Sequence, residues 1–191
     1  MKNCNRISLI IFILTFCISC KAQFGLDQSP LNVPKLSYMQ DTNNDLSKYV
    51  GTWKANFNNK VFFLYISKHI HKLNDNIKIY QDMVEIKYIV KNMSETLTLN
   101  QNFNLSFNTT YDKHSIYSFR LKPQEQKVQL TYSGTNCGVG WGLIELTSLS
   151  NTQINWSYVP NSTTLTDQTC PPGQDLTIYL PITQNLVFTK Q

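Results

Sequence analysis

The sequence contains very little alanine and very little charge. Alanine occurs at only two of 191 positions, Ala22 and Ala55, and charged residues make up 15% of the chain. Alanine is the strongest helix former, so its scarcity argues against a helical domain. Coiled coils and disordered tails are rich in charge, so the low charge argues against both of these. Asparagine, serine and threonine supply 53 residues, and tyrosine and phenylalanine supply ten each. Aromatic and β-branched side chains suit a pleated, half-buried surface, so we expect one all-β domain.

No apolar run is long enough to span a bilayer. The longest, residues 7–18, has about a dozen residues, whereas a transmembrane helix needs roughly 20. It follows Lys2 and Arg6 and precedes small residues, which is the three-part pattern of a signal peptide. We therefore predict export, with residues 1–19 as a lipoprotein signal peptide.

The end of this leader resembles a bacterial lipobox. Ser19 precedes Cys20, which would become the acylated first residue, although Cys17 stands where leucine is commonest. Two or more acyl chains hold a domain at a membrane without spanning it, so we expect a lipid-anchored protein of the bacterial cell envelope, with the outer membrane favoured. The alternative is cleavage after Ala22, which would release a secreted protein that begins at Gln23.

The charge distribution does not suit nucleic acid. The whole chain carries a net charge of +5, and removal of Lys2 and Arg6 with the leader lowers it to +3. Arg120 is then the only arginine, and the lysines are scattered along the chain. Nucleic-acid-binding surfaces present clustered, arginine-bearing patches, so we predict no nucleic-acid partner.

Two cysteines remain beyond the leader and Cys20. Cys137 and Cys170 both lie in turn-rich segments, and an oxidising compartment favours a disulfide between them. Closing that loop would contribute about 3–4 kcal/mol in the chain-entropy account. A metal pair or a reactive thiol is the alternative, but neither a CxxC motif nor a neighbouring histidine supports it.

The rest of the chain divides into a tether and a β-domain. Residues 20–47 contain prolines, aspartates and paired asparagines without a sustained period, so we expect a tether or a loosely ordered arm. Residues 48–191 show period-2 alternation between turn residues, which predicts an antiparallel lipocalin-like barrel or β-sandwich of about 8–10 strands. The predicted strands cover residues 49–57, 60–73, 77–90, 97–107, 116–121, 128–132, 143–147, 154–158, 176–180 and 186–188.

Gly51 and Trp53 form a short motif at the start of the first strand. It resembles the G-x-W motif of lipocalin-type barrels, in which the tryptophan packs across the barrel floor and glycine permits close backbone approach. The resemblance marks Gly51 and Trp53 as barrel-floor candidates. The last strand offers Lys190 where those barrels carry an arginine.

A broader resemblance covers nearly the whole chain. The leader ending at residues 20–23, the strand at residues 51–54 and the terminal segment at residues 180–190 resemble an uncharacterised family of small secreted bacterial β-proteins, a domain of unknown function. The resemblance implies export and a compact β-domain. It assigns no activity, substrate or catalytic residue.

Few residues suggest chemistry. His69 and His71 are two apart on a predicted strand, hence on one face, and His114 or a carboxylate would be needed as a third metal ligand. Flanking lysines oppose a cation there, so we predict no metal site. Glu145 lies on an apolar strand and is expected to point outward. Nucleophile-elbow and phosphate-loop motifs are absent from the sequence, so we predict no catalytic residues, no cofactor and no enzyme.

Two functions remain open. The first is binding of a small apolar ligand inside the barrel. Small and apolar side chains that point inward, together with an open barrel mouth, would favour this function. The second is an envelope or cell-surface module that contacts a protein or glycan. A filled core with exposed aromatic residues, such as Tyr158 or Trp141, would favour this second function.

Overall fold

The computed structural model describes residues 23–94, 98–99, 102–106 and 112–191. The predicted leader and Cys20 lie outside these residues. Strands dominate these described residues, with four short 3₁₀ helices between them. The elements are β1 (Gln23–Gly25), η2 (Pro30–Asn32), β2 (Tyr38–Gln40), η3 (Asp45–Tyr49), β3 (Gly51–Phe57), β4 (Lys60–Asn74), β5 (Ile79–Asn92), β6 (Thr98–Leu99), β7 (Ile116–Lys122), η4 (Pro123–Glu125), β8 (Lys127–Tyr132), η5 (Asn136–Gly138), β9 (Gly142–Ser148), β10 (Gln153–Tyr158) and β11 (Thr183–Lys190).

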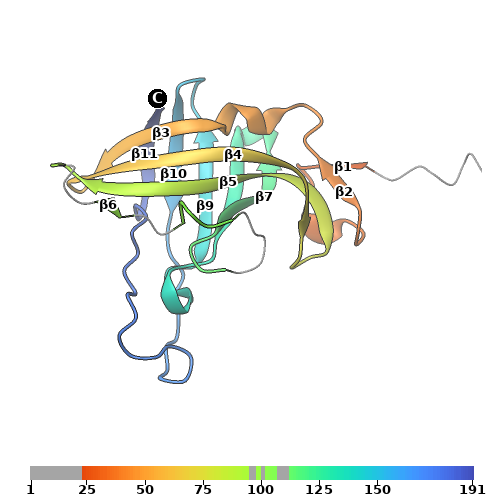
Figure 1. The fold of residues 1–191 in the computed structure, drawn as a ribbon. Helices are drawn as coiled ribbons and strands as arrows, with labels where there is room; N and C mark the ends of the chain where they lie inside the picture. Colours follow the sequence, from red (N-terminus) through yellow and green to blue (C-terminus); the bar gives the residue numbers. More distant parts are fainter. Residues whose placement is uncertain (1–22, 95–97, 100–101, 107–111) are drawn as a thin grey trace, which may run out of the picture.

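Eight of these strands close into an antiparallel barrel (Figure 1). The order around the barrel is β5-β4-β3-β11-β10-β9-β8-β7, and a β5–β7 pair at Glu85 and Tyr117 closes it. β1, β2 and β6 are additions beside β5. The predicted all-β antiparallel domain is therefore confirmed, and of the two predicted architectures the barrel is the one that forms. Within the described part of the chain, no helix has the length and apolarity to cross a bilayer.

Period-2 alternation sorts the side chains of each strand into an inner and an outer set. In β3–β5 the register places Trp53 opposite Leu64, and Leu64 opposite Tyr88. All three are buried in the barrel, whereas the neighbouring Lys54 and Asn56 point outward and are more exposed. Because a one-residue slip would exchange these sets, the apolar pattern fixes the register.

Large aromatic side chains fill the barrel interior. Trp156 packs 5.9 Å from Phe188, and Tyr132 packs 5.9 Å from Tyr158, as measured between ring centroids. The largest fully buried side chains of the described residues include Trp53, Trp156, Tyr49, Tyr88, Tyr132, Tyr158 and Phe188. The barrel is thus packed with the chain's own side chains, and Tyr158, which we named as a candidate exposed aromatic, is an interior residue.

The expected tether is instead a packed arm. Residues 23–49, hereafter the arm, contain β1, η2, β2 and η3. Leu26, Val33, Met39 and Leu46 are buried in the core that the arm shares with the barrel. These apolar side chains are irregularly spaced, so they show no helical or strand period, yet each one finds a place on the barrel. The prediction of a tether over residues 20–47 is therefore wrong for residues 23–47.

Two predicted strands do not form as expected. Of residues 97–107, only Thr98–Leu99 is a strand, and residues 102–106 form turns; residues 97, 100–101 and 107 lie outside the description. Asn102, rather than an apolar neighbour, is buried there. Its side chain accepts a hydrogen bond from Tyr88 N (2.9 Å) and donates to Ile86 O (2.9 Å) and His114 O (3.1 Å). Residues 176–180 form no strand either, because Ile178 packs over Gly140 instead of entering a ladder.

Candidate functional site

The arm lies over a seam between β5 and β7. Along this seam side chains supplement the strand ladder: Ser118 Oγ accepts a hydrogen bond from Val84 N (2.9 Å), and Gln81 Nε2 donates to Ser118 O (3.0 Å). The arm reaches both sides. β2 pairs in parallel with β5, and Leu26 O accepts a hydrogen bond from Leu121 N of β7 (3.0 Å). The arm therefore bridges the two strands at which the barrel closes.

A buried carboxylate, Asp82 of β5, fastens the arm. Asp82 Oδ1 accepts hydrogen bonds from Tyr38 Oη (2.6 Å) and His71 N (2.9 Å), and Oδ2 accepts one from Asp41 N (3.0 Å). Burial, followed by the hydrogen bond to Asp82, raises the pKa of Tyr38, because both favour the protonated hydroxyl that donates to the carboxylate. Charge-assisted hydrogen bonds of this kind are among the stronger ones in proteins.

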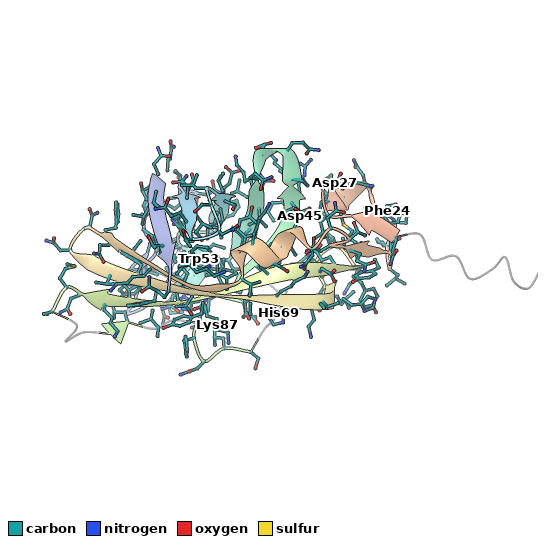
Figure 2. The ribbon with its side chains drawn as sticks, turned by 90° about the horizontal axis from the view of Figure 1, so that it is seen from above. Phe24, Asp27, Asp45, Trp53, His69 and Lys87 are labelled. Atoms are coloured by element: carbon teal, nitrogen blue, oxygen red, sulfur yellow. A yellow bond between two sulfur atoms is a disulfide. The ribbon has the colours of Figure 1, made fainter. Side chains whose placement is uncertain are left out.

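A second carboxylate, Asp41, holds the first turn of η3. Asp41 Oδ1 accepts from Asp45 N (2.8 Å), and Oδ2 accepts from Leu46 N (3.0 Å). The remaining partner is Lys68 of β4, whose Nζ lies 2.7 Å from Asp41 Oδ2 and 2.9 Å from Asn44 Oδ1. Figure 2 shows the arm residues Phe24 and Asp27 at one side of the molecule and Asp45 between them and Trp53, which is buried in the barrel.

Between the arm and the barrel is an apolar cleft of about 290 Å³. Its size is at the lower end of the range for ligand pockets. Three separate parts of the chain form it: the arm around η2, the turn between β4 and β5, and the outer face of β7 and β8. The lining residues are Ser29, Pro30, Leu31, Asn74, Asn76, Ile77, Tyr117, Phe119, Arg120 and Thr131.

Arg120 brings a charge to this cleft. The register of β7 against β8 shifts between Ser118 and Arg120, so Phe119 is an extra residue in the strand and forms a β-bulge. Bulges re-aim side chains, and here Phe119 and the adjacent Arg120 both line the cleft. Arg120 Nε is buried and has no hydrogen-bond partner among the described residues. A buried donor left in this state costs about 1–3 kcal/mol unless another acceptor reaches it.

The barrel-floor candidates lie together at one end of β3. Trp53 is fully buried, and its Nε1 donates to Tyr49 O (2.8 Å). Lys190 of β11 pairs with Trp53, and its Nζ is 5.1 Å from the centroid of the indole ring, a cation–π distance. A Cβ added to Gly51 would be 2.8 Å from Lys190 Cε, and φ is +134° there. Glycine thus allows the lysine to cross the backbone and cover the tryptophan.

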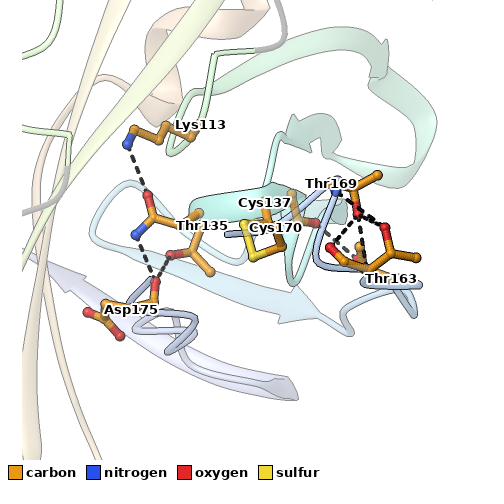
Figure 3. Close-up of a disulfide and its surroundings, with 10 residues drawn as sticks. Lys113, Thr135, Cys137, Thr163, Thr169, Cys170 and Asp175 are labelled. Atoms are coloured by element: carbon orange, nitrogen blue, oxygen red, sulfur yellow. Dashed lines mark hydrogen bonds between the residues drawn. A yellow bond between two sulfur atoms is a disulfide. The ribbon is translucent and has the colours of Figure 1, made fainter. Parts of the chain in front are cut away.

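The predicted disulfide is confirmed. Cys137 and Cys170 are bonded, with their Cα atoms 5.4 Å apart and a sequence separation of 33 (Figure 3). Cys137 belongs to η5, and Cys170 lies in the connection between β10 and β11, residues 159–182, hereafter the C-terminal loop. Figure 1 shows this loop extending from one end of the barrel beside η5. Connections of this length without regular structure are uncommon and are usually either functional loops or linkers.

Hydrogen bonds hold the C-terminal loop beside the disulfide. Asn136 Nδ2 donates to Asp175 O (2.8 Å), and Thr163 Oγ1 donates to Gly138 O (3.1 Å). Trp141 lies immediately before β9 and contacts the loop through Nε1, which donates a hydrogen bond to Ser162 O (3.3 Å). Its side chain is nevertheless 49% exposed. Trp141 is therefore an aromatic side chain displayed beside a covalently fixed loop.

The two neighbouring histidines do not share a strand face. A bulge separates His69 from Lys72, and His71 has φ +52°. His69 Nε2 lies 3.1 Å from Glu85 Oε2, whereas the His71 ring stacks on Tyr80, with their centroids 4.5 Å apart. The expectation of two imidazoles on one face is thus wrong. The described residues contain no group of three or more histidine, cysteine or acidic side chains able to hold a metal ion.

Glu145 points outward from β9, as expected. Its Oε1 accepts a hydrogen bond from Gln129 Nε2 (2.8 Å), and its Oε2 lies 3.1 Å from Lys127 Nζ. Partial burial alone would raise its pKa, but these two partners outweigh that effect and hold the pKa below the usual value. Glu145 is thus an ionised member of a surface ion pair.

Sequence reasoning did not find the cleft. Arg120 stood out as the one arginine beyond the leader, which counted against nucleic-acid binding but said nothing of where its side chain lies. The other walls are contributed by the arm and by a turn, both remote from β7 in sequence. Only a three-dimensional arrangement brings these segments together.

The fold defines the class of this protein: a filled, eight-stranded antiparallel barrel with a packed arm and a disulfide-fixed loop. The chain belongs to a family of unknown function, DUF6705, whose family model matches residues 1–191. The predicted resemblance to an uncharacterised family is therefore confirmed, whereas bacterial origin and the lipocalin likeness stay predictions. No curated protein and no solved structure matches the chain.

Proposed function

We propose that this chain is an exported, membrane-anchored, non-enzymatic binding protein that takes up a small apolar ligand in the cleft between the arm and the barrel. The single observation that carries this proposal is the cleft itself, with its apolar walls and one convergent cation. Ligand sites combine these two features, apolar lining for affinity and a few polar groups for orientation. Because side chains fill the barrel interior, we place the ligand site on the outer face of the barrel and not inside it.

Export and anchoring rest on the leader and on the disulfide. A Cys137–Cys170 bond is consistent with an oxidising compartment. The test is metabolic labelling with an alkyne fatty acid: the full chain should take up label, and Cys20→Ala should abolish it. Labelling that survives Cys20→Ala would overturn the anchor. An unlabelled protein whose first residue is Gln23 would instead establish cleavage after Ala22.

The non-enzymatic part of the proposal rests on how the buried carboxylates are used. Asp41 and Asp82 both accept hydrogen bonds from backbone N–H groups of the arm or the β4 bulge. Such bonds fix a carboxylate as an acceptor, which suits a structural role. In this interpretation the two buried carboxylates hold the arm in place, and the cleft recognises the ligand.

The ligand test uses decanol, a neutral apolar probe, and the full chain carrying Cys20→Ala, purified without detergent. Titration calorimetry should give saturable binding. Thr131→Trp, which places an indole on the cleft wall, should abolish it. Thr147→Trp is the matched control, because Thr147 is also a partly buried outer residue of the sheet but does not line the cleft. Absent binding, or binding unaffected by Thr131→Trp, would overturn the proposal.

A second candidate is an interaction module, and the exposed Trp141 favours it. Aromatic side chains on rigid supports are common anchors of protein interfaces. A photo-crosslinking amino acid at position 141 should form an adduct with an envelope protein in intact cells. Position 149 is the control, because Leu149 is 53% exposed in a turn of the barrel. Equal crosslinking from both positions would count against a specific surface at Trp141.

A further inference from the structure

We propose that the ligand of the cleft is an amphiphile with one carboxylate, whose acidic group pairs with the Arg120 guanidinium while its apolar chain covers Leu31, Ile77 and Phe119. This inference rests on the proposed function and deepens it, because it names the chemical class of the ligand. A neutral oil or a cation would leave the guanidinium without a partner.

The first argument is the state of Arg120. Its Nε is buried without an acceptor, and none of the salt bridges formed by the described residues includes this guanidinium. By contrast Lys127, one strand away, is bound by both Glu125 and Glu145. A guanidinium presents a planar fork of donors that matches a carboxylate in two parallel hydrogen bonds. Arg120 has that fork and no carboxylate of its own.

The second argument is the apolar rim. Leu31, on the arm, keeps 79% of its surface exposed although it lines the cleft. An isolated exposed leucine is ordinary, but Leu31 stands beside Ile77 and Phe119 around one hollow. A chain lying along these three side chains would remove apolar surface from water, which is favourable at about 25 cal/mol per Å².

The third argument is size and charge. A cleft of about 290 Å³ suits a short acyl chain or a single ring rather than a whole lipid. The polar rim contains Asn76, whose Nδ2 donates to Tyr117 Oη (3.1 Å), so it is already organised by the protein. The positive net charge of the chain also favours the approach of an anion.

The experiment compares decanoate with decanol, which have the same chain length and differ in the acidic group. Calorimetry on the full chain carrying Cys20→Ala should show decanoate binding about 10- to 100-fold more tightly than decanol, the range expected for hydrogen bonds to a charged group. Arg120→Gln should remove this preference, so that decanoate and decanol bind the variant with similar affinities. Lys54→Gln, which removes an outward cation on β3 away from the cleft, is the control and should keep the preference.

A second measurement needs no variant of Arg120. The chain has two arginines, so the Nε–H signals in a ¹H–¹⁵N spectrum are few and assignable. Decanoate should shift the Arg120 Nε–H signal, and decanol should not. Equal affinities with an unmoved signal would overturn the carboxylate assignment while the proposed function stands. If neither probe binds, the proposed function itself fails.

Discussion

The arm and the C-terminal loop are both long segments outside the barrel, but different chemistry holds them. The arm buries Leu26, Val33, Met39 and Leu46 and is fastened by two carboxylates. The C-terminal loop, residues 159–182, buries only Leu180 and Pro181 and is held by a covalent bond at Cys170. A segment with apolar side chains can be folded onto a core, whereas a polar segment needs a crosslink to stay ordered.

This difference also separates the two candidate functions. The arm supplies one wall of the apolar cleft, so its attachment determines whether that site exists. The disulfide-fixed end displays Trp141, so the bond positions a surface rather than a cavity. The arm should therefore respond to loss of buried hydrogen bonds, and the C-terminal loop to reduction. The following experiments separate those responses.

Removal of the disulfide should have the largest effect. For a bond that joins residues 33 apart, the chain-entropy account predicts that Cys137→Ser with Cys170→Ser lowers the free energy of unfolding by about 3–4 kcal/mol. Urea unfolding followed by tryptophan fluorescence measures this. A reductant should lower the stability of the native chain to that of the double variant and leave the variant unchanged. Equal stabilities with and without the bond would contradict the prediction.

Asp82→Asn should loosen the arm. The amide keeps one acceptor oxygen where the carboxylate serves Tyr38, Asp41 and His71, so at least one buried donor is left unsatisfied, at a cost of about 2–3 kcal/mol. Limited proteolysis should then cut within residues 23–49 while the C-terminal loop stays bonded. Asp27→Asn, at an exposed position of the arm, should change nothing. Cleavage in the loop instead would reverse the assignment of roles.

His114 should make stability depend on pH. Burial first, and then the neighbouring Lys113, lower its pKa in the folded state; Asp175 opposes them with a smaller effect. In the unfolded chain His114 takes up a proton near pH 6.5, whereas in the folded chain it takes up the proton only at lower pH. The free energy of unfolding therefore falls as pH decreases from 7 to 5. One proton limits the slope to about 1.4 kcal/mol per pH unit.

His114→Asn should flatten this pH profile. Asparagine tolerates the left-handed backbone at this position, where φ is +67°, so the backbone conformation is retained. Urea unfolding of both proteins at several pH values measures the difference. If the slope of the variant equalled that of the native chain, another group would be responsible for it.

The sequence predicted the barrel strands better than it predicted either outer segment. Alternation is visible where one face of a strand is buried, as for Trp53 in β3 and Trp156 in β10, because the side-chain period is two. The C-terminal loop shows why alternation can also mislead. Ile178 continues a period-2 pattern, yet it packs over Gly140 at the barrel end without strand pairing.

The arm and the cleft were beyond the reach of sequence patterns for a related reason. The hydrogen bond from Leu121 N to Leu26 O joins residues almost a hundred positions apart, and no local sequence pattern predicts such a contact. Asp82 lies on an alternating strand, and its donors Tyr38 and Asp41 are about forty positions away in sequence, so no local pattern marks it as the residue that fastens the arm. The disulfide could be predicted because only two cysteines were left to pair. A single candidate pairing, unlike many candidate contacts, can be deduced by elimination.

The smallest effect on stability should come from Trp141→Ser. The side chain is half-exposed, and the backbone bond from Asn161 N to Trp141 O (2.9 Å) does not depend on the indole, so stability should change by less than about 0.5 kcal/mol. Iodide should quench Trp141 but not the buried Trp53 and Trp156, and the variant should lose the quenchable emission. A large loss of stability would show that the indole holds the C-terminal loop in place. A small loss of stability would favour a role for the exposed indole in contacting another molecule.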